Sequence, residues 1–299
     1  MKTTTSGDHG STAQPYPRYQ HEQVEWLDLM HRQHTVHGLL SCDVTEARRK
    51  IREYRAATGT GLSLTAFVVA CFAQAIAADR QVHAYRRGRH TLVLFDDVDV
   101  TVLVESDVEG AKIPVPHIVR AADRMSVAAI HDEIRAAQRD PVPYAGGRRL
   151  LPLWLLVPRF LRVWFWSMVL AEPRRRKRLT GTAVVTSVGM FGRAMAWGIP
   201  ITDHTVALTV GGIERRLSVV RADDRTVSAG EAARTIDGLG ATERIAVREH
   251  LALTLSFDHD VVDGAPASRF AARLKALIET GHGIGTVGPT DGPSVSHRS

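Results

Sequence analysis

The sequence predicts a mixed α/β fold in which helices and short strands alternate. Residues 45–57, 63–78 and 126–139 have the apolar spacing or composition of helices. A further helix follows Gly264, because Phe270, Leu274 and Ile278 repeat at helical spacing. Short runs rich in β-branched or apolar residues predict strands at residues 39–44, 91–95, 98–104, 182–186, 205–210 and 251–257.

The three predicted helices of the N-terminal half differ in their expected surroundings. Residues 45–57 carry Arg and Lys on one face, which indicates a helix with one side in water. Residues 63–78 are apolar and alanine-rich, which predicts a buried helix. Ser63 and Ser126 stand where an N-cap is expected, so each marks the start of its helix.

The chain divides into one domain between two tails. Residues 1–19 and 281–299 are rich in small and polar residues, which predicts disorder, and residues 20–280 are expected to form the domain. The first tail lacks the apolar core of a secretory signal. Cys42 and Cys71 do not suggest a disulfide scaffold, so we expect a cytoplasmic protein.

A hydrophobic and basic insert at residues 141–178 interrupts the domain. Residues 150–170 have the length of a membrane span, but prolines and two arginines, Arg159 and Arg162, interrupt them. An arginine at the bilayer centre costs about 2.5–3.5 kcal/mol, so contact with the membrane surface fits better than a span. The basic run 174–178 would then face anionic lipid. Packing against the domain or another subunit is the alternative.

Two motifs carry the functional signal. Residues 253–270 read LTLSFDHDVVDGAPASRF, and residues 181–192 read GTAVVTSVGMFG. In this order they resemble the dihydrolipoamide acyltransferases of 2-oxo acid dehydrogenase complexes, whose superfamily includes chloramphenicol acetyltransferase. Weaker matches lie at residues 34–55 and 62–78 and at the KIPV sequence of residues 112–115.

The resemblance covers roughly residues 18–280, apart from the insert and a polar loop at 221–242. It implies a chloramphenicol acetyltransferase-like fold, a two-layer sandwich whose mixed β-sheet has helices packed on one face. It also implies a homotrimer, or a multiple of three, with each active site between two subunits.

Acyl transfer between two thiols needs a base for the thiol proton and a donor for the oxyanion of the tetrahedral intermediate. By resemblance, His259 is the general base that acts on the thiol of coenzyme A or of the acceptor. Asp263 is implied to form a structural salt bridge, with Arg18 as candidate partner. Alignment of the glycines places Thr186 on the family's oxyanion-stabilising serine, with Ser187 in reserve.

Two departures from the family pattern affect the expected function. We expect no lipoyl or subunit-binding domain before the core, and therefore no covalent lipoyl group on this chain and a lipoyl-type or other acceptor supplied in trans. Asp260 replaces the arginine that usually follows the histidine. The first hypothesis is therefore a CoA-dependent acyltransferase. The alternative is a catalytically degenerate trimeric scaffold or membrane-associated assembly partner.

The sequence gives little support for other chemistries. His31, His34 and His37 lack an accompanying cysteine or carboxylate set, so no metal site is predicted. The sequence contains no Walker or dinucleotide-binding glycine pattern. The formal net charge of +6 is concentrated in the run 174–178, and we expect no nucleic-acid partner.

Overall fold

The computed structural model describes residues 24, 27–28, 33–108, 111–140, 157–188, 195–221 and 243–285. The first predicted tail, residues 286–299 of the second and the loop at 222–242 lie outside these residues. Residues 281–285, which were predicted to begin the second tail, are described, and Ile284 is buried in the core. The strands of the main sheet are β1 (Thr35–Asp43), β4 (Val100–Val108), β5 (Ala111–Val119), β6 (Ala183–Ser187), β7 (Val206–Arg221) and β8 (Glu243–Asp258).

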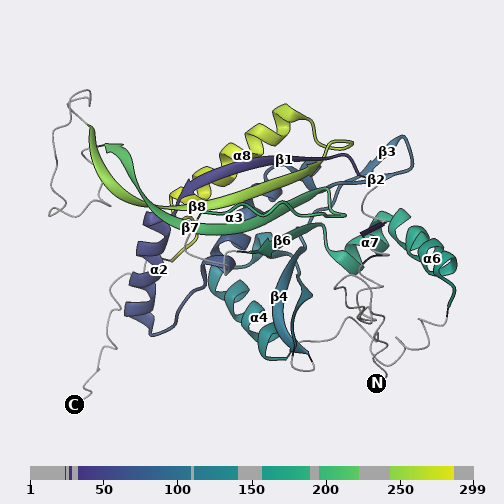
Figure 1. The fold of residues 1–299 in the computed structure, drawn as a ribbon, viewed down its shortest axis with the longest axis horizontal. Coiled ribbons are helices and arrows are strands. Elements are labelled where there is room, and N and C mark those ends of the chain that lie inside the picture. Colours follow the sequence, from purple (N-terminus) through teal and green to yellow (C-terminus); the bar gives the residue numbers. More distant parts are fainter. Residues whose placement is uncertain are drawn as a thin grey trace, which may run out of the picture.

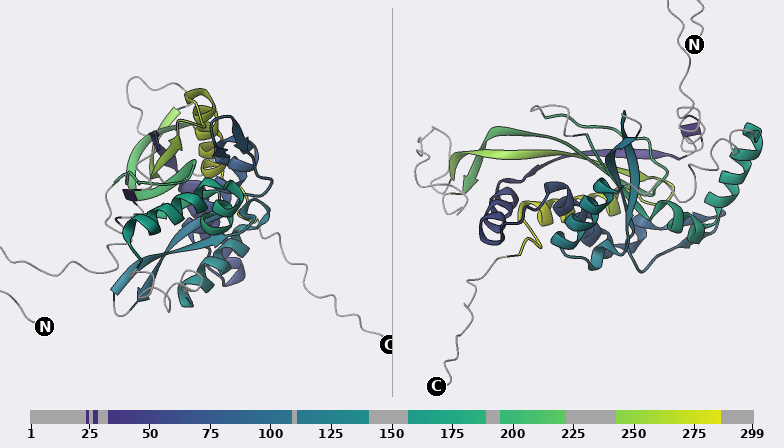
Figure 2. Two further views of the ribbon diagram at one scale, coloured as in Figure 1. Left: turned by 90° about the vertical axis from the view of Figure 1, so that its right-hand side faces the viewer. Right: turned by 90° about the horizontal axis from the view of Figure 1, so that it is seen from below.

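These six strands form one mixed sheet in the order β1-β8-β7-β6-β4-β5. β6 is parallel to β4 and β7, and the other neighbours are antiparallel. The helices that cover the sheet are α2 (Thr45–Thr58), α3 (Leu64–Ala77), α4 (Val127–Arg139) and α8 (Gly264–Glu279). They lie on one face, as Figure 2 shows, so the predicted fold class is confirmed.

The core lies between α3 and the sheet. Ten of the fourteen residues of α3 are buried, which explains why this segment is apolar on every side. Phe72 of α3 meets Phe270 of α8 edge to face, with ring centroids 5.9 Å apart. The predicted N-caps are confirmed, because Ser63 and Ser126 each accept a hydrogen bond from the third amide beyond them.

The strands predicted at 91–95 and 98–104 belong to different sheets. β3 (Thr91–Val93) pairs with β2 (Tyr85–Arg87) in a two-stranded sheet, beside the short helix η1 (Arg80–His83). β4 pairs instead with β5 and β6. Sequence reasoning missed β5 because it contains Pro114 and Pro116. Proline is tolerated there because β5 is an edge strand. The short helix η2 (Ala122–Arg124) follows β5.

β7 and β8 are longer than their apolar patterns predicted, at 16 residues each. Beyond Ile213 they form a hairpin arm that extends from the body (Figure 1), and its exposed side chains, such as Leu217, give no core signal. The register shifts between Val210 and Ile213, so Gly211 and Gly212 occupy a bulge. A Cβ at Gly211 would lie 2.0 Å from the carbonyl oxygen of Ala196, so only glycine fits this close approach.

The described part of the insert contains two helices. α6 (Arg159–Ala171) and α7 (Pro173–Thr180) meet at Glu172, and α6 projects from the end of the molecule (Figure 1). Residues 141–156 lie outside the described residues. Among the helices that the structure describes, none has the length and apolar character needed to cross a membrane.

Candidate active site

His259 is the first residue beyond β8, and the backbone around it is held by both neighbouring strands. The His259 amide donates to the carbonyl of His34 at 2.8 Å, and the Asp258 amide donates to the carbonyl of Thr205 at 2.9 Å. The imidazole is about half exposed, at 48%. His259 is therefore fixed at the backbone, while its side chain remains open to a substrate.

The turn after His259 is closed by Asp258. Its carbonyl accepts the amides of Val261 and Val262, both at 3.0 Å, and both valines are buried. The Asp258 carboxylate accepts the amide of Asp260 at 3.1 Å. Burial raises the pKa of the Asp258 carboxyl above its usual value. This hydrogen-bonded turn fixes the position of His259 at the end of β8.

Asp263 stands at the N-cap position of α8 and is 86% exposed. Its carboxylate lies 3.9 Å from the Nδ1 atom of His259, which is too long for a hydrogen bond. Arg18, the expected salt-bridge partner, lies outside the described residues. The structural salt bridge of Asp263 therefore stays a prediction.

Asp260, the unusual residue after the histidine, has its own partners. It accepts a hydrogen bond from Nδ1 of His34 at 2.9 Å and forms an ion pair with Arg86 of β2 at 3.0 Å. The hydrogen bond from His34, reinforced by Arg86, holds the pKa of the Asp260 carboxyl below its usual value. Its negative charge is therefore paired with His34, just before β1, and with Arg86 of β2.

The two candidate oxyanion donors lie on opposite faces of β6. Val185 faces the helix-covered core, so Ser187, two residues on, shares that face. Thr186 points to the other face, where it stands opposite Thr209 of β7, which stands opposite Thr254 of β8. The choice between Thr186 and Ser187 is thus a choice between two faces of the sheet.

The strand register separates Thr186 from His259 within one chain. Thr186 is level with Thr254, two strands away, and His259 is five residues beyond Thr254. At about 3.3 Å per residue and about 4.8 Å per strand, the two residues are roughly 19 Å apart. A base and an oxyanion donor must both lie within hydrogen-bond reach of one substrate. One chain therefore does not unite them.

Ser187 lines an open pocket of about 670 Å³ at the other end of the sheet from His259. α2 and α3 contribute to its wall, and so does the bulge of β7. Arg48 forms an ion pair with Glu249 at 2.7 Å within this wall, and Arg215 lies at its rim. The volume falls in the usual range for small-molecule sites.

Sequence reasoning missed a buried polar cluster next to the β8 turn. Asp203 lies 2.9 Å from Nδ1 of His204 and 4.0 Å from Arg176, whose guanidinium stacks 4.1 Å above the Tyr85 ring. Burial raises the pKa of the Asp203 carboxyl, but His204 and Arg176 outweigh it and bring the pKa down to about 2. The sequence signal for this cluster was the adjacent pair Asp203 and His204, just before the apolar strand that begins at Val206.

The histidines near β1 have other partners than a metal. His34 bonds Asp260, and Nδ1 of His37 lies 2.8 Å from the hydroxyl of Ser256. His31 lies outside the described residues. Within the described ranges, no three His, Cys, Asp or Glu side chains are grouped as metal ligands would be.

The fold and the His259 turn define a class, an α/β domain in which a histidine directly follows the last described strand of a mixed sheet. Residues 175–284 match the model of a family described as 2-oxoacid dehydrogenases acyltransferase (catalytic domain). The resemblance stated from the two motifs is thereby confirmed, and these residues are similar to the catalytic domain of the 2-oxoacid dehydrogenase acyltransferases.

Individual relatives agree. The lipoamide acyltransferase component of the branched-chain alpha-keto acid dehydrogenase complex of Bacillus subtilis is 23% identical over 81% of this chain and 46% of its own length. A probable dihydrolipoamide acetyltransferase of Listeria monocytogenes has the same fold, with TM-score 0.59, 20% identity and coverage of 91% and 96% of the two chains. The cubic core of a pyruvate dehydrogenase multienzyme complex gives TM-score 0.61, 16% identity and coverage of 90% and 93%. The chain spans less than half the length of the curated relatives it matches.

Proposed function

We propose that this chain is a CoA-dependent acyltransferase that moves an acyl group between coenzyme A and the thiol of an acceptor supplied in trans. One observation carries the proposal. His259 projects, half exposed, from the end of a rigid strand, within the segment that matches the acyltransferase family. The lipoyl-type acceptor is the candidate favoured by the names of the relatives.

In the proposed reaction, His259 removes the proton from the attacking thiol. The resulting thiolate adds to the thioester carbonyl of the acyl donor, and the carbonyl oxygen becomes an oxyanion. When the tetrahedral intermediate collapses, the carbon–sulfur bond to the first thiol breaks. The departing thiolate takes the proton from the His259 imidazolium, so no acyl-enzyme forms and His259 is regenerated.

The oxyanion needs a hydroxyl donor, and we assign that role to Thr186 of a neighbouring subunit. The separation of about 19 Å within one chain supports this assignment, because a second copy must then complete the site. The separation calls for a second copy, and the resemblance to the acyltransferase family favours a homotrimer, or a multiple of three, as the assembly that supplies it. A protein that sediments as a monomer at micromolar concentration would contradict an active site between subunits.

The pocket at the Ser187 end is our candidate for the arm of coenzyme A. It lies on the helix-covered face of β6, so a thioester bound there would place its carbonyl near Ser187, the reserve oxyanion donor, and not near the Thr186 hydroxyl of the same chain. Arg215 among its lining residues offers positive charge to the coenzyme's phosphates, whereas Arg48 is already paired with Glu249.

A catalytically degenerate trimeric scaffold is the second candidate. It is favoured by the long contact between His259 and Asp263, since a carboxylate 3.9 Å away does not orient an imidazole by hydrogen bonding. The same fold and the same oligomer would then serve assembly alone.

Thiol release from a panel of acyl-CoA donors, with and without dihydrolipoamide, separates the two functions. We expect turnover with at least one donor, and a loss of about 10²–10⁴-fold in His259→Ala, the usual effect of removing a general base. His90→Ala is the matched control, because His90 is exposed and lies in the β2–β3 turn. An unchanged rate in folded His259→Ala would remove the base assignment, and no turnover with any donor would favour the scaffold.

A further inference from the structure

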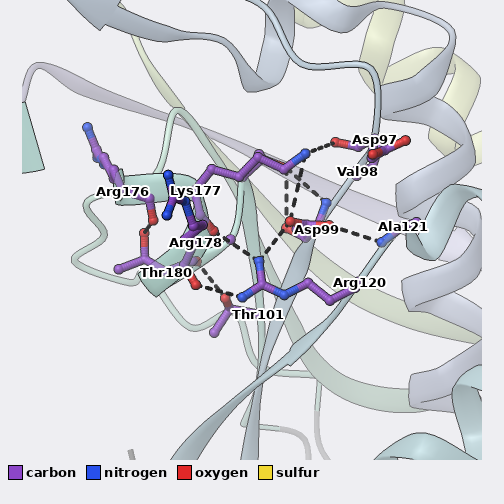
Figure 3. A network of polar contacts seen from close by, with 12 residues as sticks. Asp97, Val98, Asp99, Thr101, Arg120, Ala121, Arg176, Lys177, Arg178 and Thr180 are labelled. Atoms are coloured by element: carbon purple, nitrogen blue, oxygen red, sulfur yellow. Dashed lines mark hydrogen bonds and ion pairs between the residues drawn. The ribbon is translucent and has the colours of Figure 1, made fainter. Parts of the chain in front are cut away.

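The basic run of the insert has two distinct faces. Arg174, Arg175 and Arg178 are exposed and occupy one side of α7, at positions i, i+1 and i+4. Lys177 points the other way, toward Asp97 and Asp99 (Figure 3), and Arg176 stacks on the Tyr85 ring. Only part of the run is therefore needed to hold the fold together.

The inward face of α7 is fixed by a polar network around Asp99 of the loop before β4. The Asp99 carboxylate lies 2.8 Å from Arg120 and 3.8 Å from Lys177. Arg120 also donates to the carbonyls of Lys177 and Arg178, at 3.1 and 2.6 Å, and so caps the C-terminal end of α7 (Figure 3). The orientation of the three exposed arginines is thus set by the fold.

The helix before α7 carries an exposed apolar stripe. Phe160, Trp164 and Met168 follow one another at i, i+4 and i+8, with Leu161 and Phe165 beside them, and all five are exposed. Phe160 is 70% and Trp164 62% exposed. Contiguous apolar surface of this kind on a soluble domain marks an interaction site.

We propose that this surface, the α6 stripe with the three exposed arginines of α7, binds the surface of an anionic membrane. Charge complementarity selects this partner. Glu172 at their junction is the only acidic residue from Arg159 to Thr180, so a second copy seated stripe to stripe offers one carboxylate to the three exposed arginines. An anionic leaflet offers negative headgroups to the arginines and an apolar layer to Trp164 and Phe160.

The dimensions favour a helix that lies on the membrane. α6 has 13 residues, or about 20 Å, against a hydrocarbon layer of about 30 Å. Tryptophan and arginine are both favoured at the headgroup depth that such a helix occupies. This binding is independent of the proposed transfer reaction.

The membrane-binding surface lies near the His259 end of the sheet. Arg176 of α7 stacks on Tyr85 of β2, and Arg86 of the same strand pairs with Asp260. An acyl donor or acceptor held in the membrane would therefore be near the candidate active site.

The test is co-sedimentation of the full chain with vesicles of phosphatidylcholine alone or with phosphatidylserine, at low and high salt. We expect binding to the anionic vesicles, weakened by salt. Each exposed arginine contributes about fivefold, so replacing Arg174, Arg175 and Arg178 by Gln should lower the partition coefficient by roughly 100-fold. Trp164→Ser with Met168→Ser should also lower the fraction of protein that sediments with the anionic vesicles, because it removes apolar surface from the centre of the α6 stripe.

The matched control removes the same charge elsewhere. Arg52, Arg55 and Arg139 are exposed on α2 and α4, and their joint replacement by Gln should leave vesicle binding unchanged. Equal loss in both triple variants would show only a net-charge effect and would overturn the proposal. So would an absence of vesicle binding at low salt. A change of oligomeric state in the stripe variant, without vesicle binding, would identify another copy of the chain as the partner.

Discussion

Two inactive variants should restore activity when they share one oligomer. His259→Ala lacks the base and Thr186→Val lacks the oxyanion donor, so each alone should be nearly inactive. Within one chain the two side chains are roughly 19 Å apart, a distance that no side-chain rotation closes. If each site takes His259 from one subunit and Thr186 from the next, a mixed oligomer contains sites in which both are intact.

The expected recovery follows from counting sites. In a trimer with two subunits of one variant and one of the other, one of the three interfaces combines an intact His259 with an intact Thr186. Mixed trimers should therefore show about one-third of wild-type activity, whichever variant is in excess. The two variants are co-expressed with different affinity tags and purified on both in series, and thiol release is then measured per trimer.

The control for this experiment is a mixed oligomer of wild type and His259→Ala, purified in the same way. Its activity should follow the number of intact His259 residues, which shows that assembly and tags do not impair the site. If the control is active and the mixture of the two variants is as inactive as its parents, Thr186 and His259 do not act across an interface. The assignment of Thr186 would then fail.

Two further predictions concern the sheet and the core. Thr186→Val should lower kcat by about 10²–10³-fold with little change in KM, whereas Ser187→Ala should not; the reverse result would place the reacting carbonyl on the helix-covered face of β6. Burial, helped by Lys177, lowers the pKa of His83 to about 4. The unfolded state therefore binds a proton at His83 at a higher pH than the folded state does. The free energy of unfolding is fully maintained above about pH 6.5 and decreases as the pH falls toward 4. Between pH 8 and pH 5 the free energy of unfolding measured in urea should drop by about 2 kcal/mol from this group. The drop should be smaller by that amount in His83→Leu but not in the exposed-residue control His90→Leu, and equal drops in all three proteins would refute the role of His83.

Local signals were the ones that sequence reasoning read correctly. Ser63 and Ser126 act within three residues of themselves, so their N-cap role is visible without knowledge of the fold. The spacing of the apolar residues of α8 likewise predicts which face of the helix is buried, and Phe270, Leu274 and Ile278 are all buried. The position of His259 at a strand end followed from the same kind of local pattern.

Contacts between distant segments were out of reach. Asp260 is paired with His34, 226 residues away in sequence, so the residues near Asp260 do not predict that its charge has a partner. The hairpin arm of β7 and β8 was also missed, because β-strands are recognised by a buried face and Leu217 and Val219 are exposed. The periodicity of the basic run separates two faces of α7, but only Asp99 and Tyr85 determine which face turns inward.

The arrangement of the two half-sites has a consequence for catalysis. The turn at His259 is held by the carbonyls of His34 and Thr205, just before β1 and β7, and Thr186 by the pairing of β6 with β7, so neither half-site needs the other in order to form. In the proposed oligomer their relative position is then set by the subunit interface. Transfer rates fall steeply when a base or an oxyanion donor is displaced by about 1 Å. Substitutions at the interface should therefore lower kcat in proteins whose folded structure is unchanged, which is why activity measured per trimer, rather than stability, is the sensitive measure of this site.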